Sequence, residues 1–434
     1  MFKLATFKAK LLAIVFASFV VRVVAFFALP NSASTFAPDE GQYANLVSWV
    51  AQGKTVNEYP SFGSGLYNSS RSIILPSSLF YRLGLNPLDS IRLTSSIYSL
   101  LSTILVVVIV IKLNREKGII GYSLQKHQTM IVILVSVFTF LPSRYAWSVL
   151  GLRESSVEFW TVLVFGIVFI TNVLEEKISF KSATFFVFAI IMVHSSRPQV
   201  GLVLGGALIL YFFSSIKKRS SRLLISLTVV GMFLGSATSA TSTTSATSTT
   251  SATSTTSTTS TTSTTYLTKV LDSANELSSN IYAQHKRNQV GAASVIPDFA
   301  CPFGPEIPVD GVVCLLWRSP QTTFTFLFKP LFGADVSSLS SMFAATENLL
   351  WLGTMFFVGI MLAWNRRLAF FPALAPSVIF MFVYVTLAGA YEGNMGTAFR
   401  HKSLILWVVI LLLASTIVAT QQRKAEREGI SGSF

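Results

Sequence analysis

The feature of this sequence that most constrains its fold is a series of ten apolar segments separated by more polar stretches. A helix needs about 17–25 such residues to cross a bilayer. Only 12% of the 434 residues are charged, which is about half the share in a soluble globular chain. This pattern excludes a soluble enzyme, a secreted domain and a disordered protein. It predicts an all-α polytopic membrane protein with about ten transmembrane helices, in the lipid bilayer. The predicted spans are Leu11–Leu29, Leu93–Ile111, Gln128–Leu141, Val157–Leu174, Ser182–His194, Gln199–Phe213, Leu223–Gly235, Leu349–Trp364, Leu368–Ala390 and Ser403–Thr420.

The positions of Lys and Arg predict which side of the membrane each loop occupies. The formal net charge is +14, but no basic soluble domain is present to hold a duplex, so nucleic acid is not an expected partner. The Lys and Arg residues are densest in the short loops on the same side as the N-terminus, which is typical of cytoplasmic loops. We therefore expect a multi-pass plasma (inner) membrane protein with both termini cytoplasmic and with its first span retained as an anchor.

The polar stretches divide the chain into four regions. Two of the outer stretches are long enough to hold interfacial helices, for example Ser72–Leu85 in the first loop and Phe324–Phe332 in the second. The Ser/Thr/Ala tract is either a flexible linker or an O-glycosylated stalk. Residues 182–213 form either two short spans or one re-entrant element, broken at Arg197-Pro198. The regions are an N-terminal transmembrane region (1–235) with a first outer loop (30–92), a low-complexity linker (236–265), an extracytoplasmic or interfacial segment (266–346) and a C-terminal transmembrane region (347–434).

The two cysteines of the chain, Cys301 and Cys314, both fall in the long outer segment. Two cysteines are too few for a disulfide framework or a zinc site. Because the extracytoplasmic side is oxidising, we expect a single disulfide that closes a loop around residues 302–313. The alternative is a pair of free cysteines packed in an interfacial segment.

A pair of carboxylates, Asp39 and Glu40, lies about ten residues after the first predicted span. A carboxylate at that position can act as a general base toward an acceptor hydroxyl or amine, or it can hold a divalent cation. The alternative is an acidic loop that caps a helix over Gln42–Gln52. No second Asp stands at the Asp-x-Asp spacing that would favour a bound metal ion. The sequence therefore predicts no cofactor with certainty and leaves open whether the site holds a divalent cation.

Further charged residues gather at the outer ends of later spans. Ionisable groups at the membrane are costly and tend to be functional. Arginine and lysine that converge at an interface suit a phosphate or pyrophosphate ligand, because the guanidinium group binds such anions through two parallel hydrogen bonds. The alternative is a set of snorkelling side chains that fix the depth of each helix. The candidates for phosphate binding are Arg144, Arg153, Glu154, Arg197, Arg400, His401 and Lys402, with Arg22, Glu158, His194 and Glu392 nearby in the same pattern.

Several short motifs resemble the GT-C superfamily of membrane glycosyltransferases. The most specific is the first-loop sequence Ala37–Ala44 (APDEGQYA), followed by Ala51–Lys54 (AQGK). Within the superfamily the chain is most similar to the bacterial family-39-like enzymes, which are related to protein O-mannosyltransferases and lipid A aminoarabinose transferase. The weaker motifs are Leu152–Ser155, Lys329–Phe332, Glu347-Asn348 and Asn394–Thr397 with Arg400-His401.

The resemblance implies a transferase that moves a sugar from a polyprenyl-phosphate donor to an acceptor outside the cytoplasm, which is a glycan, a lipid or a protein. In that family the first-loop Asp is the base or acceptor-orienting carboxylate, which here is Asp39 with Glu40 beside it. Basic residues at the outer ends of later spans hold the lipid phosphate. Here these are Arg144, Arg153, Arg197 and Arg400.

Two other functions compete with this interpretation. An O-antigen polymerase or ligase type of enzyme also has many spans and arginines in its outer loops, and it would depend on Arg and His while Asp39 would be dispensable. A lipid-linked sugar flippase or other transporter would place its polar residues near the bilayer midplane and often contains internal repeats. No repeat relates the two halves of this sequence, and only the break at Arg197-Pro198 favours transport.

Overall fold

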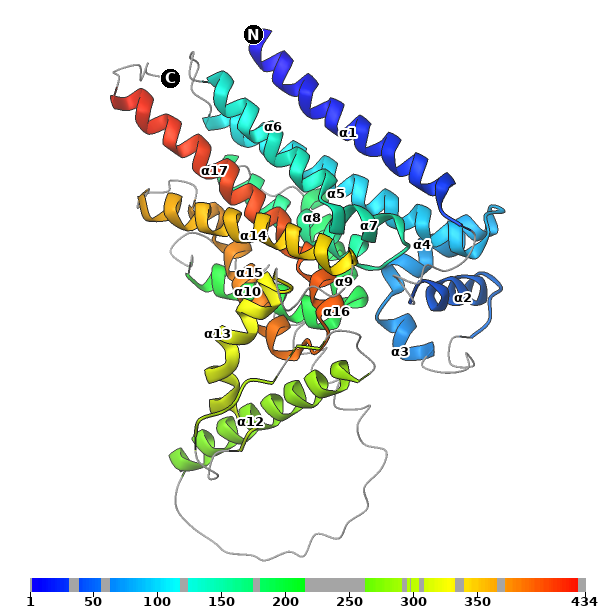
Figure 1. Ribbon diagram of the computed structural model, residues 1–434, viewed down its shortest axis with the longest axis vertical. Coiled ribbons are helices and arrows are strands. Elements are labelled where there is room, and N and C mark those ends of the chain that lie inside the picture. Colours follow the sequence, from blue (N-terminus) through cyan, green and yellow to red (C-terminus); the bar gives the residue numbers. More distant parts are fainter. Residues whose placement is uncertain are drawn as a thin grey trace, which may run out of the picture. The chain divides into compact units, whose positions relative to one another are not determined.

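Helices account for nearly all of the chain that the computed structural model describes, in agreement with the sequence (Figure 1). The described residues are 2–30, 39–55, 63–117, 124–174, 180–214, 262–290, 295–296, 298–303, 308–331, 339–364 and 371–427. Within them there is no strand, and the one isolated β-bridge joins Val295 to Asn394. The helices are α1 (Phe2–Ala28), α2 (Asp39–Ala51), α3 (Gly63–Asn68), α4 (Arg71–Arg82), α5 (Pro87–Lys117), α6 (Leu124–Phe140), α7 (Pro142–Val149), α8 (Glu154–Leu174), α9 (Phe180–Ser196), α10 (Pro198–Ser214), α12 (Thr262–Gln289), α13 (Val312–Phe328), α14 (Leu339–Trp364), α15 (Phe371–Tyr391), α16 (Met395–His401) and α17 (Ser403–Arg427).

Four of the described helices are long and apolar enough to cross a membrane, and the number rises to six if two bent pairs each count as one span. The predicted count of ten is therefore not confirmed. Residues 182–213 form two helices, α9 and α10, which are apolar but only 17 residues long each. The expected span Leu349–Trp364 lies within α14, and Leu223–Gly235 lies outside the described residues. The four spans are Thr6–Ala28, Pro87–Leu113, Glu154–Thr171 and Leu374–Tyr391, and the bent pairs are Gln128–Phe140 with Pro142–Val149 and Met395–His401 with Ser403–Val418.

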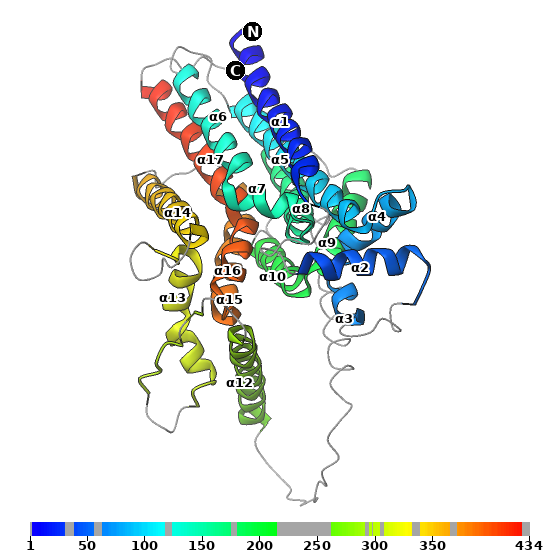
Figure 2. The same cartoon turned by 45° about the vertical axis from the view of Figure 1, so that its right-hand side comes forward.

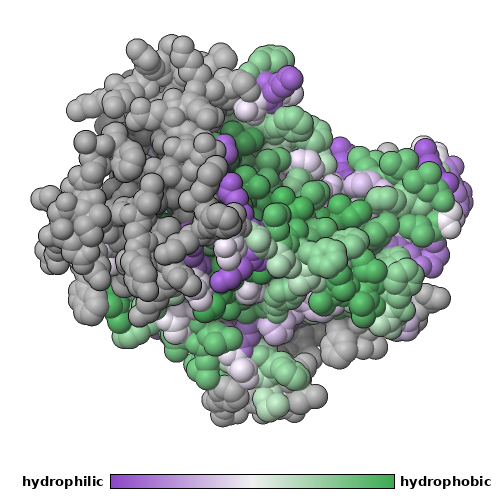
Figure 3. All heavy atoms as spheres, turned by 90° about the horizontal axis from the view of Figure 1, so that it is seen from above, coloured by the Kyte–Doolittle hydropathy of each residue, from purple (hydrophilic) through white to green (hydrophobic). Residues whose placement is uncertain are grey.

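Large apolar side chains lie on the surface of these helices. On α1, Phe16, Val24 and Phe27 are each more than 60% exposed. In Figure 3, apolar side chains, drawn in green, cover much of the described surface in view, with hydrophilic side chains between them. A soluble monomer rarely exposes contiguous apolar surface on this scale. The helices therefore fit a multi-pass membrane protein whose apolar surface contacts lipid.

The described residues separate into two units, and the first comprises Met1–Leu204, Pro330–Met381 and Phe399–Phe434. In it, α1, α5, α6 and α17 lie side by side, and α8 packs against α5 (Figures 1 and 2). These helices alternate in direction, so α1 and α6 end at the end of the bundle where α5 and α8 begin (Figure 1). The short helices α2 and α4 pack together against the beginning of α5. This arrangement places α2 and α4, from the segment between α1 and α5, at one end of the helix bundle.

The short helix α4 fits the amphipathic pattern predicted for Ser72–Leu85. Its buried face includes Ile73 and Ile74, whereas Leu75, Leu79 and Leu83 are exposed on the opposite face. Leucines spaced by four residues form one stripe along a helix. The placement of this stripe in the membrane interface stays a prediction.

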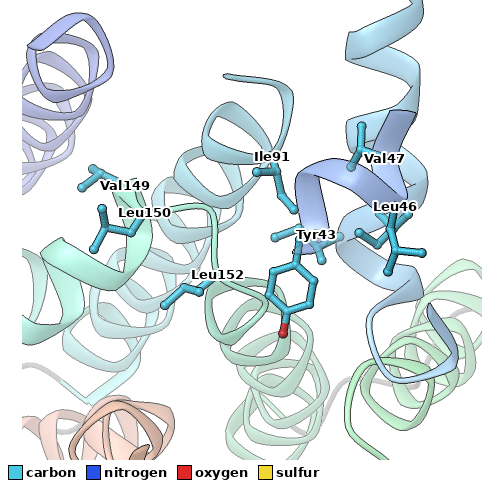
Figure 4. Close-up of a cluster of buried hydrophobic side chains, with 9 residues drawn as sticks. Tyr43, Leu46, Val47, Ile91, Val149, Leu150 and Leu152 are labelled. Carbon is cyan, nitrogen blue, oxygen red and sulfur yellow. The ribbon is translucent and has the colours of Figure 1, made fainter. Parts of the chain in front are cut away.

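A buried apolar cluster holds α2 to the end of the bundle (Figure 4). Tyr43 lies in the middle of the cluster, and its hydroxyl oxygen points away from Ile91. The turn between α7 and α8 closes the cluster through Leu150 and Leu152. Between these two leucines, Gly151 has a φ of +64°, and a Cβ atom built there would lie 2.8 Å from Cγ2 of Ile91. Only glycine fits this turn without strain.

We predict that Gly151→Ala lowers the stability of the first unit by about 2–5 kcal/mol, because it combines left-handed backbone strain with overpacking. Gly53→Ala is the matched control, since Gly53 has a similar φ of +72° and no atom within 4 Å of its added Cβ. The control substitution should cost only about 1–2 kcal/mol. Thermal unfolding of the full chain in detergent measures both, and equal losses would contradict the packing argument.

The second unit comprises Gly205–Lys329 and Phe382–Ala398. Its core is formed by α12 and α13, which contact each other. A disulfide joins Cys301 to Cys314, with Cα atoms 5.5 Å apart, as the sequence predicts. Most of the Ser/Thr/Ala linker (236–261) lies outside the described residues, and from Thr262 the chain belongs to α12.

A charged cluster on α12 fastens the segment that carries the first cysteine. His285 lies 3.3 Å from the carboxylate of Asp298, and Lys286 donates a hydrogen bond to the same carboxylate. Burial lowers the pKa of His285 below its ordinary value, although Asp298 and a hydrogen bond to the backbone of Glu392 oppose this shift; Lys286 and Arg318 add to it. Burial alone would raise the pKa of Asp298, but Lys286 and His285 outweigh it and lower that pKa. The cluster therefore contains a neutral histidine and an ionised aspartate at neutral pH.

We predict that acidification destabilises the second unit in two stages. A histidine whose folded pKa is lowered contributes stability above its ordinary pKa of 6.5, and this contribution is lost as the pH falls below that value. The Asp298 contribution is lost only at a pH below its ordinary pKa of 3.8. Hydrogen exchange of α12 in the full chain, corrected for intrinsic exchange rates, measures the loss. His285→Gln should flatten the first stage, which begins near pH 6.5, whereas Glu276→Gln, an exposed change on the same helix, should not.

Candidate functional site

Five of the charged residues predicted from the sequence meet at the end of the first unit where α5 and α8 begin. We call Asp39, Glu154, Arg197, Arg400 and His401 the Arg-carboxylate cluster. Arg400 Nη1 lies 3.3 Å from Oδ2 of Asp39. Glu154 Oε1 lies 3.5 Å from Nη2 of Arg197 and 3.6 Å from Nε2 of His401, and the Arg197 and His401 side chains contact each other. Residues from four separate parts of the sequence thus form one constellation.

Local sequence explains how these side chains reach the cluster. Asp39 and Glu154 are each the first residue of a helix, α2 and α8, where a carboxylate interacts favourably with the positive end of the helix dipole. Arg197 precedes Pro198, and the residue before a proline disfavours helical geometry. For this reason α9 ends at Ser196, and Arg197 occupies the break before α10. Arg400 and His401 end α16, at its bend with α17.

The Asp39 side chain is more exposed to solvent than the other side chains of the cluster. The Asp39 side chain is 43% exposed, whereas Glu154 is 6% and Arg197 is 8% exposed. Arg400 is 14% exposed and its guanidinium lies 5.7 Å from the centre of the Trp147 ring. Asp39 is therefore the carboxylate of the cluster that an external molecule can reach.

Two further side chains border the cluster. Arg153 donates hydrogen bonds to the backbone and hydroxyl oxygens of Ser69, and its buried Nε has no hydrogen-bond partner among the described residues. Burial raises the pKa of Tyr43, which is opposed by the charge of Arg153 and reinforced by Glu154. Tyr43 is therefore a neutral hydroxyl donor beside the cluster.

The charges of this region do not cancel. Asp39 and Glu154 supply two negative charges, and Arg153, Arg197 and Arg400 supply three positive charges. Among the described residues Arg153 forms no salt bridge, and it lies close enough to Glu154 to interact with it electrostatically. A buried surplus of positive charge beside apolar helices favours binding of an anion.

The structure gives Glu40 a different environment from that of Asp39. Glu40 is fully buried and accepts two hydrogen bonds from Arg92, at 2.7 Å from Nε and 3.2 Å from Nη2. Arg92 also donates to the backbone oxygen of Pro30, at 2.7 Å. This one guanidinium thus links α2, the chain just after α1 and the beginning of α5. The sequence analysis missed Arg92, although it directly precedes the predicted span Leu93–Ile111 and could have been found by the rule applied to the other arginines.

Arg144 and Lys402 do not join the cluster. Arg144 pairs with Glu158 inside the bundle, with Nη2 2.7 Å from Oε1, and it also donates to the backbone oxygen of Ser99. Lys402 donates to Asn348, which in turn donates to the backbone oxygen of Pro330 at 2.8 Å. Both side chains are nearly fully buried. Their hydrogen bonds connect helices of the bundle, so the structure places these two predicted phosphate ligands apart from the site.

No group of three His, Cys, Asp or Glu side chains that could hold a metal ion occurs among the described residues. Comparison with known proteins finds no matching family model, no matching curated protein and no matching solved structure.

We predict that the two neighbouring carboxylates differ in their contribution to stability. Glu40→Gln breaks a fully buried ion pair and should destabilise the first unit by about 3–5 kcal/mol. Asp39→Asn removes a partly exposed pair and should cost less than about 1 kcal/mol. Thermal unfolding in detergent compares the two variants. An Asp39→Asn variant as unstable as Glu40→Gln would show that Asp39 is a structural residue.

Proposed function

We propose that the chain is an integral-membrane glycosyltransferase of the GT-C type, which transfers a sugar from a polyprenyl-phosphate donor to an acceptor outside the cytoplasm. The observation that carries the proposal is the Arg-carboxylate cluster, in which a reachable carboxylate stands beside an arginine at the end of apolar helices. The first-loop motif that resembles this superfamily supplies that carboxylate. In this proposal the cluster lies on the extracytoplasmic face of the plasma membrane and both termini are cytoplasmic.

The donor fits the site by its two chemical parts. A polyprenyl tail is apolar and can follow the exposed apolar side chains of the helices. Its phosphate is an anion at the membrane surface, where Arg153, Arg197 and Arg400 hold the surplus positive charge. Guanidinium groups bind phosphate oxygens through paired hydrogen bonds, so the arginines orient the donor and stabilise the charge that grows on the phosphate as it leaves.

The reaction we propose is a direct displacement at the anomeric carbon. The Asp39 carboxylate accepts the proton of the acceptor hydroxyl, whose oxygen forms a new bond to the anomeric carbon. The bond from that carbon to the phosphate oxygen breaks, and its electron pair leaves with polyprenyl phosphate. Arg400 contacts Asp39 in the unliganded cluster. A donor phosphate that attracts Arg400 would free the carboxylate to act as the base only when donor is bound.

We predict that Asp39→Asn lowers the transfer rate by about 10²–10⁴-fold, which is the usual contribution of a general base. Expression and insertion should be unchanged, because the substitution removes charge with little change of shape. A radiolabelled sugar-transfer assay in membranes measures the rate. The control is Asp89→Asn, which removes another first-loop carboxylate outside the cluster. Full activity of Asp39→Asn would refute its assignment as the base.

We predict that Arg400→Ala weakens donor binding more than it slows the chemical step, because it removes a phosphate contact. The KM for donor should rise by about tenfold or more, with a smaller fall in kcat. Lys54→Ala, which removes an exposed positive charge after α2, should leave the KM unchanged. A fall in kcat with an unchanged KM would contradict a role in donor binding.

A second candidate, an O-antigen polymerase or ligase type of enzyme, is favoured by one part of the cluster. His401 and Arg197 contact each other and share Glu154, and a carboxylate beside a histidine can orient it as an acid or base. This enzyme would lose activity in His401→Gln and keep it in Asp39→Asn. The opposite result supports the glycosyltransferase proposal, so the two variants in one assay distinguish the functions.

A further inference from the structure

A small half-open cavity of about 30 Å³ lies in the second unit, between α12, α13 and the chain that leads into the disulfide loop. This volume holds about two water molecules. Its polar lining includes Ser278, His285, Asp298, Asp310 and Arg318. None of these residues belongs to the Arg-carboxylate cluster, and the proposed function uses none of them.

Three buried polar atoms of this lining have no hydrogen-bond partner among the described residues, namely Arg318 Nε, Ser278 Oγ and His285 Nδ1. Arg318 is 7% exposed, and its Nε has no hydrogen-bond acceptor among the described residues. The rest of its guanidinium is held by the backbone oxygen of Val309 and by the face of the Tyr282 ring. Ser278 is 1% exposed, and its hydroxyl also has no partner. Because an unsatisfied buried polar group costs about 1–3 kcal/mol, the Arg318 and Ser278 donors call for acceptors beyond the described residues.

The same cavity also contains acceptors. Asp310 accepts a hydrogen bond from Ser279 at 2.7 Å through Oδ2, and among the described residues Oδ1 has capacity to accept another. Asp298 accepts hydrogen bonds from Lys286 and, at 3.3 Å, from Gln289. A ligand that fills the cavity must therefore both accept and donate hydrogen bonds.

The charged side chains that line the cavity restrict the kind of ligand that it can bind. An anion that accepts from Arg318 would face the carboxylates of Asp298 and Asp310. A cation that pairs with those carboxylates would face the Arg318 guanidinium. Hydroxyl groups are neutral, each donates one hydrogen bond and accepts up to two, and two of them occupy about the space of two water molecules.

We propose that this cavity binds the hydroxyl-bearing edge of a neutral sugar. One hydroxyl oxygen accepts from Arg318 Nε and Ser278 Oγ, and a hydroxyl hydrogen is donated to Asp310. Only an edge of the sugar ring enters, because the cavity is too small for a whole ring, and the open side admits the remainder. The disulfide between Cys301 and Cys314 holds the two walls together, since it joins the chain that carries Asp298 to the helix that carries Arg318.

The test is binding of single sugars to the purified full chain in nanodiscs, measured by saturation-transfer NMR with glucose, mannose and galactose as neutral probes. Glucuronate and glucosamine serve as charged probes of similar size. We expect at least one neutral hexose to bind saturably and more tightly than either charged probe. Ser278→Ala and Asp310→Asn should each weaken binding about five- to tenfold, because each removes one hydrogen bond. Glu276→Gln, an exposed change on α12, is the matched control and should not weaken it.

Three outcomes would overturn the proposal. The first is the absence of saturable binding by every neutral hexose. The second is tighter binding of glucuronate or glucosamine, which contradicts the charge argument. The third is binding that Ser278→Ala and Asp310→Asn leave unchanged, because the sugar would then bind elsewhere. If only Asp39→Asn abolished binding, that other place would be the Arg-carboxylate cluster. The sugar-binding measurement does not depend on transfer activity. The sugar-binding proposal can therefore fail while the proposed function holds, and the proposed function can fail while sugar binding holds.

Discussion

The buried ion pair between Glu40 and Arg92 is the interaction on which the candidate site depends. A charged side chain at the end of apolar helices has little water to solvate it, so it needs a partner of opposite charge with good hydrogen-bond geometry. Arg92 satisfies this need for Glu40 and also binds the backbone oxygen of Pro30. As a result, the first turn of α2 has a defined position at the beginning of α5. Asp39, the preceding residue, is thereby presented at the surface of the bundle.

The same requirement explains why the charged residues of the first unit divide into two kinds. Arg144 is matched by Glu158, and Lys402 donates to Asn348 deep among the helices. These side chains connect helices and have their hydrogen bonds directed inward. The Arg-carboxylate cluster differs because the bordering Arg153 forms no salt bridge among the described residues and because Asp39 is exposed. A polar group that is neither matched nor fully buried is available to a ligand, and this is the physical basis for placing function there.

The second unit also provides partners for its charged side chains. A disulfide together with the Asp298 cluster connects the chain between α12 and α13 to these two helices. Ser278 Oγ and Arg318 Nε are buried at this junction without an acceptor among the described residues.

The sequence by itself predicted the helical class, most of the long apolar helices, the disulfide and a set of charged residues that contains the cluster. These features follow from local pattern: runs of apolar residues, two cysteines on one side, and charges at the ends of spans. It did not determine the number of spans, because α9 and α10 are of marginal length. The sequence also could not show that Asp39 is exposed while Glu40 is buried, or that Arg197 joins the cluster while Arg144 does not. The two residues of each pair have the same chemistry and similar positions relative to the predicted spans. The tertiary structure decided these cases, because burial and partners arise from contacts between residues far apart in sequence, such as Glu40 with Arg92 and Asp39 with Arg400.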